Sequence, residues 1–138
     1  MSENIPKLYN LPLRTGEAGF VVPFINDVLG SCRAIDAYIS TIDQHAIKPW
    51  RRHRASISNL YATKGVIKIV VYSQMTDSFH EYTLDHSLHQ LLVIPPSYWF
   101  AMQNLCQSPS SMINFASLPY DLMESDKRSI DFFPYIWT

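Results

Sequence analysis

One short segment, Arg51-Arg52-His53, contains residue types suited to acid–base chemistry on an anionic substrate. On a β-strand, alternate side chains point to the same face, so Arg51 and His53 share one face while Arg52 and Arg54 point to the other. An imidazole, with an unperturbed pKa near about 6.5, exchanges protons at neutral pH. A guanidinium stays charged and donates paired hydrogen bonds to a phosphate or to a developing enolate oxygen. We therefore single out His53 and Arg51 as candidate catalytic residues.

Both residues also have a purely structural explanation, and the sequence leaves it open. His53 can be a buried, neutral imidazole whose hydrogen bonds serve only the fold, and Arg51 can form an inward ion pair, for instance with Asp131. A carboxylate such as Asp131 beside His53 instead favours the acid–base interpretation, because it would orient the ring and raise its basicity.

The overall charge argues against nucleic acid as a partner. The 138 residues include 11 Lys and Arg against 12 Asp and Glu, a net charge of -1, whereas proteins that bind the phosphate backbone carry a clear excess of cations. Lys48, Arg52 and Arg54 form a local basic cluster in this near-neutral chain. That cluster can steer an anionic nucleotide, or it can be the charged surface of a solvated edge strand.

No segment has the length and apolar character of a membrane span. The most apolar stretches, 66–72 and 91–102, are interrupted by a lysine and by a proline pair, and Met1–Lys7 lacks the apolar core of a signal peptide. We expect no membrane partner and a cytoplasmic location. Cys32 and Cys106, which belong to no CxxC pair, are expected to be reduced structural thiols.

The elements that must position these residues are predicted to be strands. Only 4 glycines stand against 9 prolines, 8 tyrosines and 7 phenylalanines, a composition that favours an all-β chain. Short strands at close spacing are typical of a sandwich or barrel, and the turns between them are too short for interdomain linkers, so a single domain over 1–138 is expected. One short helix is possible within Pro119–Arg128, followed by an extended segment, Ser129–Trp137, that packs down. The predicted strands are Leu8–Leu13, Gly19–Phe24, Ala34–Thr41, Ile57–Thr63, Val66–Ser73, Phe79–Leu84, Gln90–Ile94, Tyr98–Gln103 and Met112–Ser117.

Two segments keep the spacing of known motifs. In the first, Arg51 and His53 are followed after four residues by Ser58 and after six more by Gly65, which resembles the His-x-His, Glu, Gly motif of the cupin superfamily. In the second, Pro95-Pro96-Ser97 is followed by Phe100 and Asn104, which resembles the family's Pro-x-Gly, His, Asn motif. This resemblance implies a double-stranded β-helix barrel of the jelly-roll type, with Arg51 and His53 on its inner face.

The resemblance also implies that the metal ligands of the superfamily are missing. Metal-binding cupins use two His, a Glu and a later His, and this sequence offers Arg51, His53, Ser58 and Phe100 in those places; a shorter gap puts Ile57 at the Glu place. One ligand in four does not hold a transition metal, so we expect no metal and no cofactor. The pair His86 and His89 lies in a polar turn and is expected to be solvated.

The finer sequence is similar to one metal-free branch of cupins, the proteins related to dTDP-4-dehydrorhamnose 3,5-epimerase and the neighbouring dTDP-sugar 3,4-ketoisomerases. The similarity covers roughly residues 45–137. It implies a homodimer that acts on a dTDP-linked 4-keto-6-deoxyhexose in surface polysaccharide biosynthesis. The similar stretches are Ile47–His53, Asn59–Tyr61, Gly65–Tyr72, Leu92–Phe100, Met112–Ser117, Tyr120-Asp121 and Asp131–Trp137.

Departures from that branch leave two functions open. Arg51 stands where the epimerase resemblance implies a general base, and Asn114 where it implies an acidic Tyr; an arginine cannot serve as a base near neutral pH. His53 matches the second of two His of the ketoisomerases, and a single base can move a proton between C3 and C4 of a ketosugar. The first hypothesis is thus a sugar-nucleotide isomerase or epimerase. The alternative is a non-catalytic cupin that binds a nucleotide sugar or carbohydrate.

Further residues are candidates for substrate binding because they are aromatic residues near the motifs or polar residues within apolar strands. Most aromatic residues of a small barrel belong to its core, and the facing of the polar residues is not fixed by the sequence. The candidates are Trp50, Ser58, Tyr61, Lys68, Phe100, Asn114, Tyr120 and Asp131.

Overall fold

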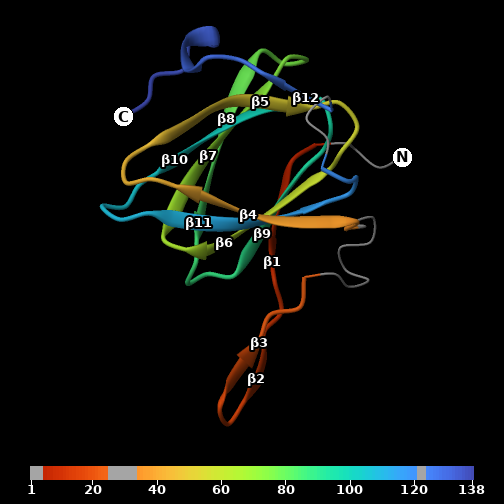
Figure 1. Ribbon diagram of the computed structural model, residues 1–138, viewed down its shortest axis with the longest axis vertical. Coiled ribbons are helices and arrows are strands. Elements are labelled where there is room, and N and C mark those ends of the chain that lie inside the picture. Colours follow the sequence, from red (N-terminus) through yellow and green to blue (C-terminus); the bar gives the residue numbers. More distant parts are fainter. Residues whose placement is uncertain (1–4, 25–33, 121–123) are drawn as a thin grey trace.

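Two five-stranded antiparallel sheets packed face to face form the body of the protein (Figure 1), so the expected all-β jelly-roll architecture is confirmed. The computed structural model describes residues 5–24, 34–120 and 124–138. The first sheet has the order β1 (Lys7–Asn10), β9 (Gln90–Ile94), β6 (Ser58–Lys64), β11 (Ser110–Ala116) and β4 (Asp36–Ile42); the second has the order β12 (Ser125–Lys127), β5 (Ile47–His53), β10 (Trp99–Asn104), β7 (Val66–Ser73) and β8 (Ser78–Asp85).

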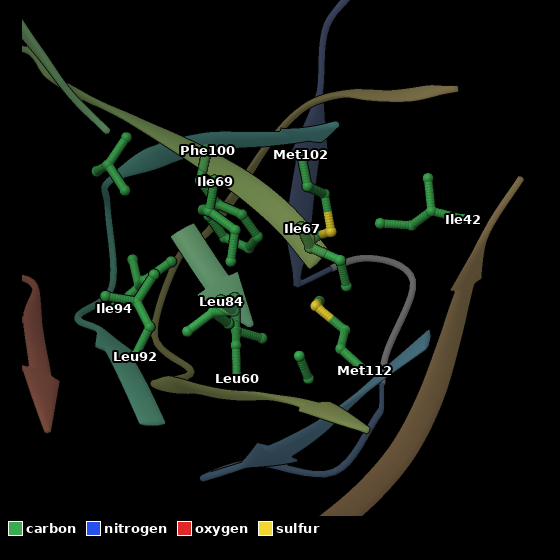
Figure 2. Packing of buried hydrophobic residues seen from close by; sticks show 12 residues of the cluster. Ile42, Leu60, Ile67, Ile69, Leu84, Leu92, Ile94, Phe100, Met102 and Met112 are labelled. Atoms are coloured by element: carbon green, nitrogen blue, oxygen red, sulfur yellow. The ribbon is translucent and has the colours of Figure 1, made fainter. Parts of the chain in front are cut away.

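The main core lies between the two sheets (Figure 2). Alternate residues of β7, Ile67, Ile69 and Val71, point inward and meet Leu60 of β6 and Leu92 of β9, all almost completely buried. Burying each such side chain contributes about 1.5–3 kcal/mol to folding. The period of two therefore fixes which face of each strand points into the sandwich.

The outer face of the second sheet is also buried, because the C-terminal tail crosses it (Figure 1). A short 3-10 turn, η2 (Ile130–Phe132), leads into an extended segment in which Phe133, Tyr135 and Trp137 pack down onto the sheet. Trp50 lies beneath them and donates its indole N–H to the carbonyl of Ile130 at 3.1 Å. The expectation that this segment packs down is met.

A small hairpin extends away from the two sheets (Figure 1). It consists of β2 (Arg14–Gly16) and β3 (Gly19–Val21), which pair only with each other. Its apolar side chains are solvent-exposed, with Phe20 54% and Val21 63% accessible. A hairpin of this length gains little stability from its own contacts.

Each predicted strand overlaps an observed one, but β2, β5 and β12 are observed where the sequence analysis predicts no strand. The shared facing predicted for Arg51 and His53 requires a strand, and β5 is that strand. The possible helix at Pro119–Arg128 is wrong where the structure describes it, since β12 occupies 125–127 and residues 121–123 lie outside the described ranges. Backbone pairing with β5 outweighs local propensity there.

Cys106 is a free, partly buried thiol, and Cys32 lies outside the described residues. Within the ranges that the structure describes, no helix is long and apolar enough to cross a membrane.

Asn104, the asparagine of the second motif, links the end of β4, the loop after β10 and the start of β11 by hydrogen bonds. The buried Asn104 amide donates to the carbonyls of Ile42 (3.0 Å) and Ser108 (2.8 Å). Its oxygen accepts the N–H of Cys106 (2.9 Å) and the hydroxyl of Ser110 (2.7 Å). Ser110 is thereby held in one position, beside the turn between β6 and β7.

Replacing Gly65 in that turn should destabilise the protein strongly. Gly65 has φ +81°, and an added Cβ would collide with the side chain and Cα of Ser110. Left-handed strain and overpacking each cost about 1–3 kcal/mol, so Gly65→Ala should lower the free energy of unfolding by about 3 kcal/mol in urea titrations. Gly16→Ala, which meets only one atom at 4.0 Å, is the control; equal effects of the two would refute this explanation.

Candidate active site

A cavity of about 470 Å³ opens between the sheets on the side where β4 and β5 lie. Apolar side chains of β6, β10 and β11 form its inner end, and polar side chains of β4, β5 and β11 line the rest. A few convergent polar groups in a largely apolar pocket are typical of a small-molecule site. The polar lining includes Tyr38, Ser40, Lys48, Arg51, His53 and Asn114, and the apolar lining includes Leu60, Phe100, Met102 and Met112.

His53 at the cavity wall is paired with a carboxylate. Its Nδ1 lies 2.7 Å from Oε2 of Glu124, while Oε1 of Glu124 accepts the backbone N–H groups of Ala55 (2.6 Å) and Ser56 (2.8 Å). Burial acts to raise the pKa of Glu124, but these backbone hydrogen bonds and His53 outweigh it and hold that pKa below its ordinary value. Glu124 therefore stays ionised and fixes the imidazole, leaving Nε2 as the nitrogen available for chemistry.

Glu124 reaches His53 because β12 pairs with β5, placing Ser125 opposite His53 and Asp126 opposite Arg52. Asp126 binds Arg52 (2.9 Å) and Arg54 (2.8 Å) on the outer side. The predicted basic cluster is thus divided. Arg52 and Arg54 neutralise Asp126, and Lys48 is the member of the cluster that enters the cavity.

Two cations, Lys48 and Arg51, face the cavity although they are three residues apart. Phe100 pairs with Arg51 but Met102 with Lys48, so β5 carries a bulge at this point. Such a bulge changes the facing of the side chains beyond it. Lys48 donates to the hydroxyl of Ser40, and burial together with the charge of Arg51 lowers the pKa of Lys48.

Arg51 has no hydrogen-bond or ion-pair partner among the residues that the structure describes. The two cations thus create a positive potential in the cavity. Among the described residues, Asp36 also lines the cavity and the charge of Asp43 acts on Lys48, but neither carboxylate forms an ion pair with Lys48 or Arg51. A pocket of this kind suits an anionic ligand.

A tyrosine of β4, Tyr38, also lines the cavity. Tyr38 of β4 lies directly across from Asn114 of β11, whose amide donates to the phenol oxygen at 2.9 Å. The oxygen of Asn114 accepts the backbone N–H of Asn59 at 3.0 Å. Burial raises the pKa of Tyr38 above its ordinary value, although Asn114 and Arg51 act in the opposite direction.

Of the predicted site residues, five line this cavity. Arg51, His53, Phe100, Asn114 and Tyr120 come from three strands and the segment after β11. The ring centroids of Phe100 and His53 lie 6.1 Å apart, and the two ring planes are inclined by 30°. The two rings together form one side of the pocket.

The other five do not reach it. Trp50 and Lys68 point to the outer face of the second sheet, where Lys68 pairs with Glu81 (3.3 Å) beneath the C-terminal aromatics. Tyr61 points to the outer face of the first sheet and bonds His89 (2.7 Å). These three residues therefore do not line the cavity, and the sequence did not indicate this because a strand buried on both faces gives no signal for its inner side.

Ser58 and Asp131 also lie away from the cavity lining. Ser58 is buried on the same face of β6 as Leu60 but does not line the cavity. Asp131 is exposed in η2, and the carboxylate paired with His53 is Glu124 instead.

Sequence reasoning missed Tyr38 and Glu124 and treated Lys48 only as part of a surface cluster. Alternation along 36–42 does place Tyr38 and Ser40 on one face, but nothing in the sequence says that this face is the inner one. Glu124 lies in the stretch assigned to a possible helix.

The four cupin metal positions do not fit a metal ion here. Arg51, Ser58 and Phe100 are not ligands for a transition metal, which leaves His53 alone. Among the described residues no three His, Cys, Asp or Glu side chains gather in a way that suits an ion.

No family model matches the chain. It is 27% identical over 102 residues to the probable low-salt glycan biosynthesis epimerase Agl13 of Haloferax volcanii; the match covers 70% of this chain and 65% of that protein, so the chain spans just under two thirds of this relative.

Solved structures share the fold closely. The dTDP sugar isomerase of Desulfovibrio desulfuricans has a TM-score of 0.85 at 24% identity, covering 96% of this chain and 90% of its own. QdtA, a sugar 3,4-ketoisomerase of Thermoanaerobacterium thermosaccharolyticum, has 0.77 at 20%, covering 96% and 93%. The dTDP-4-dehydrorhamnose 3,5-epimerase of Bacillus anthracis has 0.75 at 17%, covering 88% and 77%. The structural neighbours are therefore the dTDP-sugar isomerases and epimerases that the sequence resembled.

Removing Asp126 should change how stability depends on pH. The hydrogen bonds and charges of Arg54 and Arg52 lower the pKa of Asp126 from 3.8 to about 2. A carboxylate with a lowered pKa stabilises the fold fully above its unfolded pKa and loses this contribution as the pH falls through its folded pKa. We expect Asp126→Asn to have a lower urea midpoint than wild type near pH 6, with the gap closing between about pH 4 and about pH 2.

The measurement is a series of urea titrations from about pH 2 to about pH 6, which spans the folded and unfolded pKa of this carboxyl. Glu17→Gln, in the projecting hairpin, is the control. A gap that stays constant across the series would show that the pairing with Asp126 does not contribute electrostatically.

Proposed function

We propose that the protein is a sugar-nucleotide isomerase that transfers a proton at a carbon next to the keto group of a dTDP-linked 4-keto-6-deoxyhexose, without a metal. The observation that carries this proposal is the ionised Glu124 holding His53 at the wall of a cavity that also contains Arg51, which has no partner among the described residues. A histidine oriented by a carboxylate is a suitable general base, because the carboxylate stabilises the imidazolium formed on proton uptake.

The cations support an anionic substrate. Arg51 offers a planar fork for an enolate oxygen or a diphosphate, and Lys48 adds a second charge on the same side. Phe100 and Tyr120 supply aromatic surfaces against which a sugar or base can pack. Two solved structures support the choice of ligand, since QdtA was crystallised with TDP and a mutant of QdtA with TDP-4-keto-6-deoxyglucose.

A single base favours isomerisation between C3 and C4 over epimerisation at two carbons. His53 can remove the proton from C3 and return it to C4 on the same face of the sugar, whereas Arg51 cannot act as a second base. The proposal includes the place of this reaction, the cytoplasm, and its role in the synthesis of a surface glycan; the name of the Haloferax relative supports glycan biosynthesis.

The test is proton exchange followed by NMR. Purified protein in deuterated water is mixed with dTDP-4-keto-6-deoxyglucose, and deuterium at C3 or C4 and formation of the 3-keto product are recorded. His53→Ala should lower the rate by about 10²–10⁴-fold, the usual contribution of a general base. His86→Ala, an exposed histidine, should leave it unchanged.

Absence of exchange in the wild type, together with saturable binding of the same ligand, would contradict catalysis. That result would favour the alternative, a nucleotide-sugar-binding protein on an enzyme's barrel.

The proposal also includes a homodimer. The projecting hairpin exposes Phe20 and Val21, and β4 exposes Ile39 (67%) at the rim of the cavity, together with Ile35 (61%) just before it. Large exposed apolar side chains of this kind suit a contact with a second copy of the chain.

Light scattering after size-exclusion chromatography tests the dimer. Wild-type protein at high concentration should have the mass of two chains, and Phe20→Ser with Val21→Ser should shift it toward 15.9 kDa. Met75→Ser, at a 95% exposed apolar residue on the turn between β7 and β8, is the matched control. A monomeric wild type would contradict this part of the proposal.

A further inference from the structure

We propose that Trp50 is a positioning residue for the two cations of the cavity, Lys48 and Arg51. The C-terminal tail, residues 129–138, holds the indole of Trp50 and thereby the bulge of β5 that turns both cations inward. Docking of the tail and binding of an anion on the opposite face of the sheet are then coupled, and each strengthens the other. This inference rests on the anion-binding part of the proposed function and adds a contact that lies outside the cavity.

The bulge consists of two residues of β5, Pro49 and Trp50, that stand opposite one residue of β10, Ala101. A proline has no N–H to donate to a neighbouring strand, so it suits such an irregularity. Regular alternation would put Lys48 on the outer face together with Trp50. The extra residue instead turns Lys48 into the cavity, beside Arg51. The facing of Lys48 therefore depends on this bulge.

The C-terminal tail contacts the bulge through Trp50, which is 1% exposed. The indole N–H donates to the carbonyl of Ile130 at 3.1 Å, and the backbone carbonyl of Trp50 accepts the N–H of Arg128 at 3.0 Å. The ring of Phe133 packs edge-on against the indole with centroids 5.2 Å apart, and the ring of Trp137 lies at 6.0 Å. Both the side chain and the backbone of this bulge residue are thus fixed from outside the cavity.

The tail is also attached to strands beyond β5. Phe133 stacks on Tyr72 of β7 with centroids 4.3 Å apart, and Tyr135 packs against Phe79 of β8 at 5.3 Å. Because the ring that contacts Trp50 is itself anchored on β7, an outward shift of the indole would separate aromatic rings that are packed across three strands. The tail therefore resists a change in the bulge.

Repulsion between the two cations opposes the bulge. Burial and the charge of Arg51 lower the pKa of Lys48, so the two groups act on each other. Their repulsion would be smaller if Lys48 took the outward facing of a regular strand. A bound anion offsets the repulsion and so favours the bulged strand, which the docked tail favours as well. Two events that favour the same state are coupled by the same factor in both directions.

Trp50→Phe tests this coupling because it keeps an aromatic ring and removes the N–H that binds the tail. The net contribution of one hydrogen bond corresponds to a factor of about 2 to 10 in an equilibrium constant. We expect the Kd for dTDP, measured by isothermal titration calorimetry, to rise within that range. A purely structural role would lower the fraction of folded protein, and hence the number of binding sites, without changing Kd.

The matched control is Trp99→Phe. It makes the same change at another buried indole beneath the tail, whose N–H has no hydrogen-bond partner among the described residues, and Kd should stay at the wild-type value. Phe133→Ala loosens the tail without changing β5, and it serves if Trp50→Phe does not fold. It should raise Kd in the same direction.

Hydrogen exchange followed by mass spectrometry measures the coupling from the other side. In the wild type, dTDP should slow the exchange of the backbone amides of residues 128–138, although these lie on the opposite face of the sheet from the cavity. Lys48→Gln removes the repulsion. In that variant the free tail should already exchange more slowly than in the free wild type, and dTDP should add little.

The outcomes separate this inference from the proposed function. An unchanged Kd in both Trp50→Phe and Phe133→Ala, or a tail whose exchange dTDP does not slow, would overturn the inference, while turnover by the wild type would still support the isomerase. Weaker binding in these variants, with a wild type that leaves the ketosugar unchanged, would support the coupling and contradict the isomerase. A wild type that does not bind dTDP would overturn both.

Discussion

The three-residue pairing of β12 with β5 is the constraint on which the site depends. This pairing places Glu124 beside His53, and the same strand anchors itself through Asp126 between Arg52 and Arg54. It also directs the chain over the second sheet, where the tail covers Trp50. One edge pairing thus determines the orientation of the imidazole and the burial of the opposite face of the same strand.

The cavity holds two like charges close together. Lys48 and Arg51 contact no carboxylate of the described ranges, a cost that is visible in the lowered pKa of Lys48. Sites that bind charged ligands carry such costs because groups already in position lose little freedom when the ligand arrives. An anion between the two cations would offset their mutual repulsion.

Strand alternation predicted that Arg51 and His53 share one face, and the motif resemblance predicted that this face is the inner one and located Phe100. The rest required tertiary information. Lys48 enters the cavity only because of the bulge in β5, and Glu124 because a mixed-charge segment pairs as a strand. Trp50 and Lys68 lie on the outer face of a sheet buried on both sides, where hydrophobicity does not distinguish the inner face from the outer one.

The distance along the chain between paired elements has a consequence for how the molecule folds. The contact between His53 and Glu124 joins residues 71 positions apart, and β1 pairs with β9 across a comparable separation. Closing such loops costs chain entropy before any contact repays it, so folding is slow and the partly folded chain leaves strand edges unpaired. The contact between His53 and Glu124 therefore forms only once the chain has been synthesised as far as Glu124, and a shorter nascent chain contains the histidine without the carboxylate that orients it.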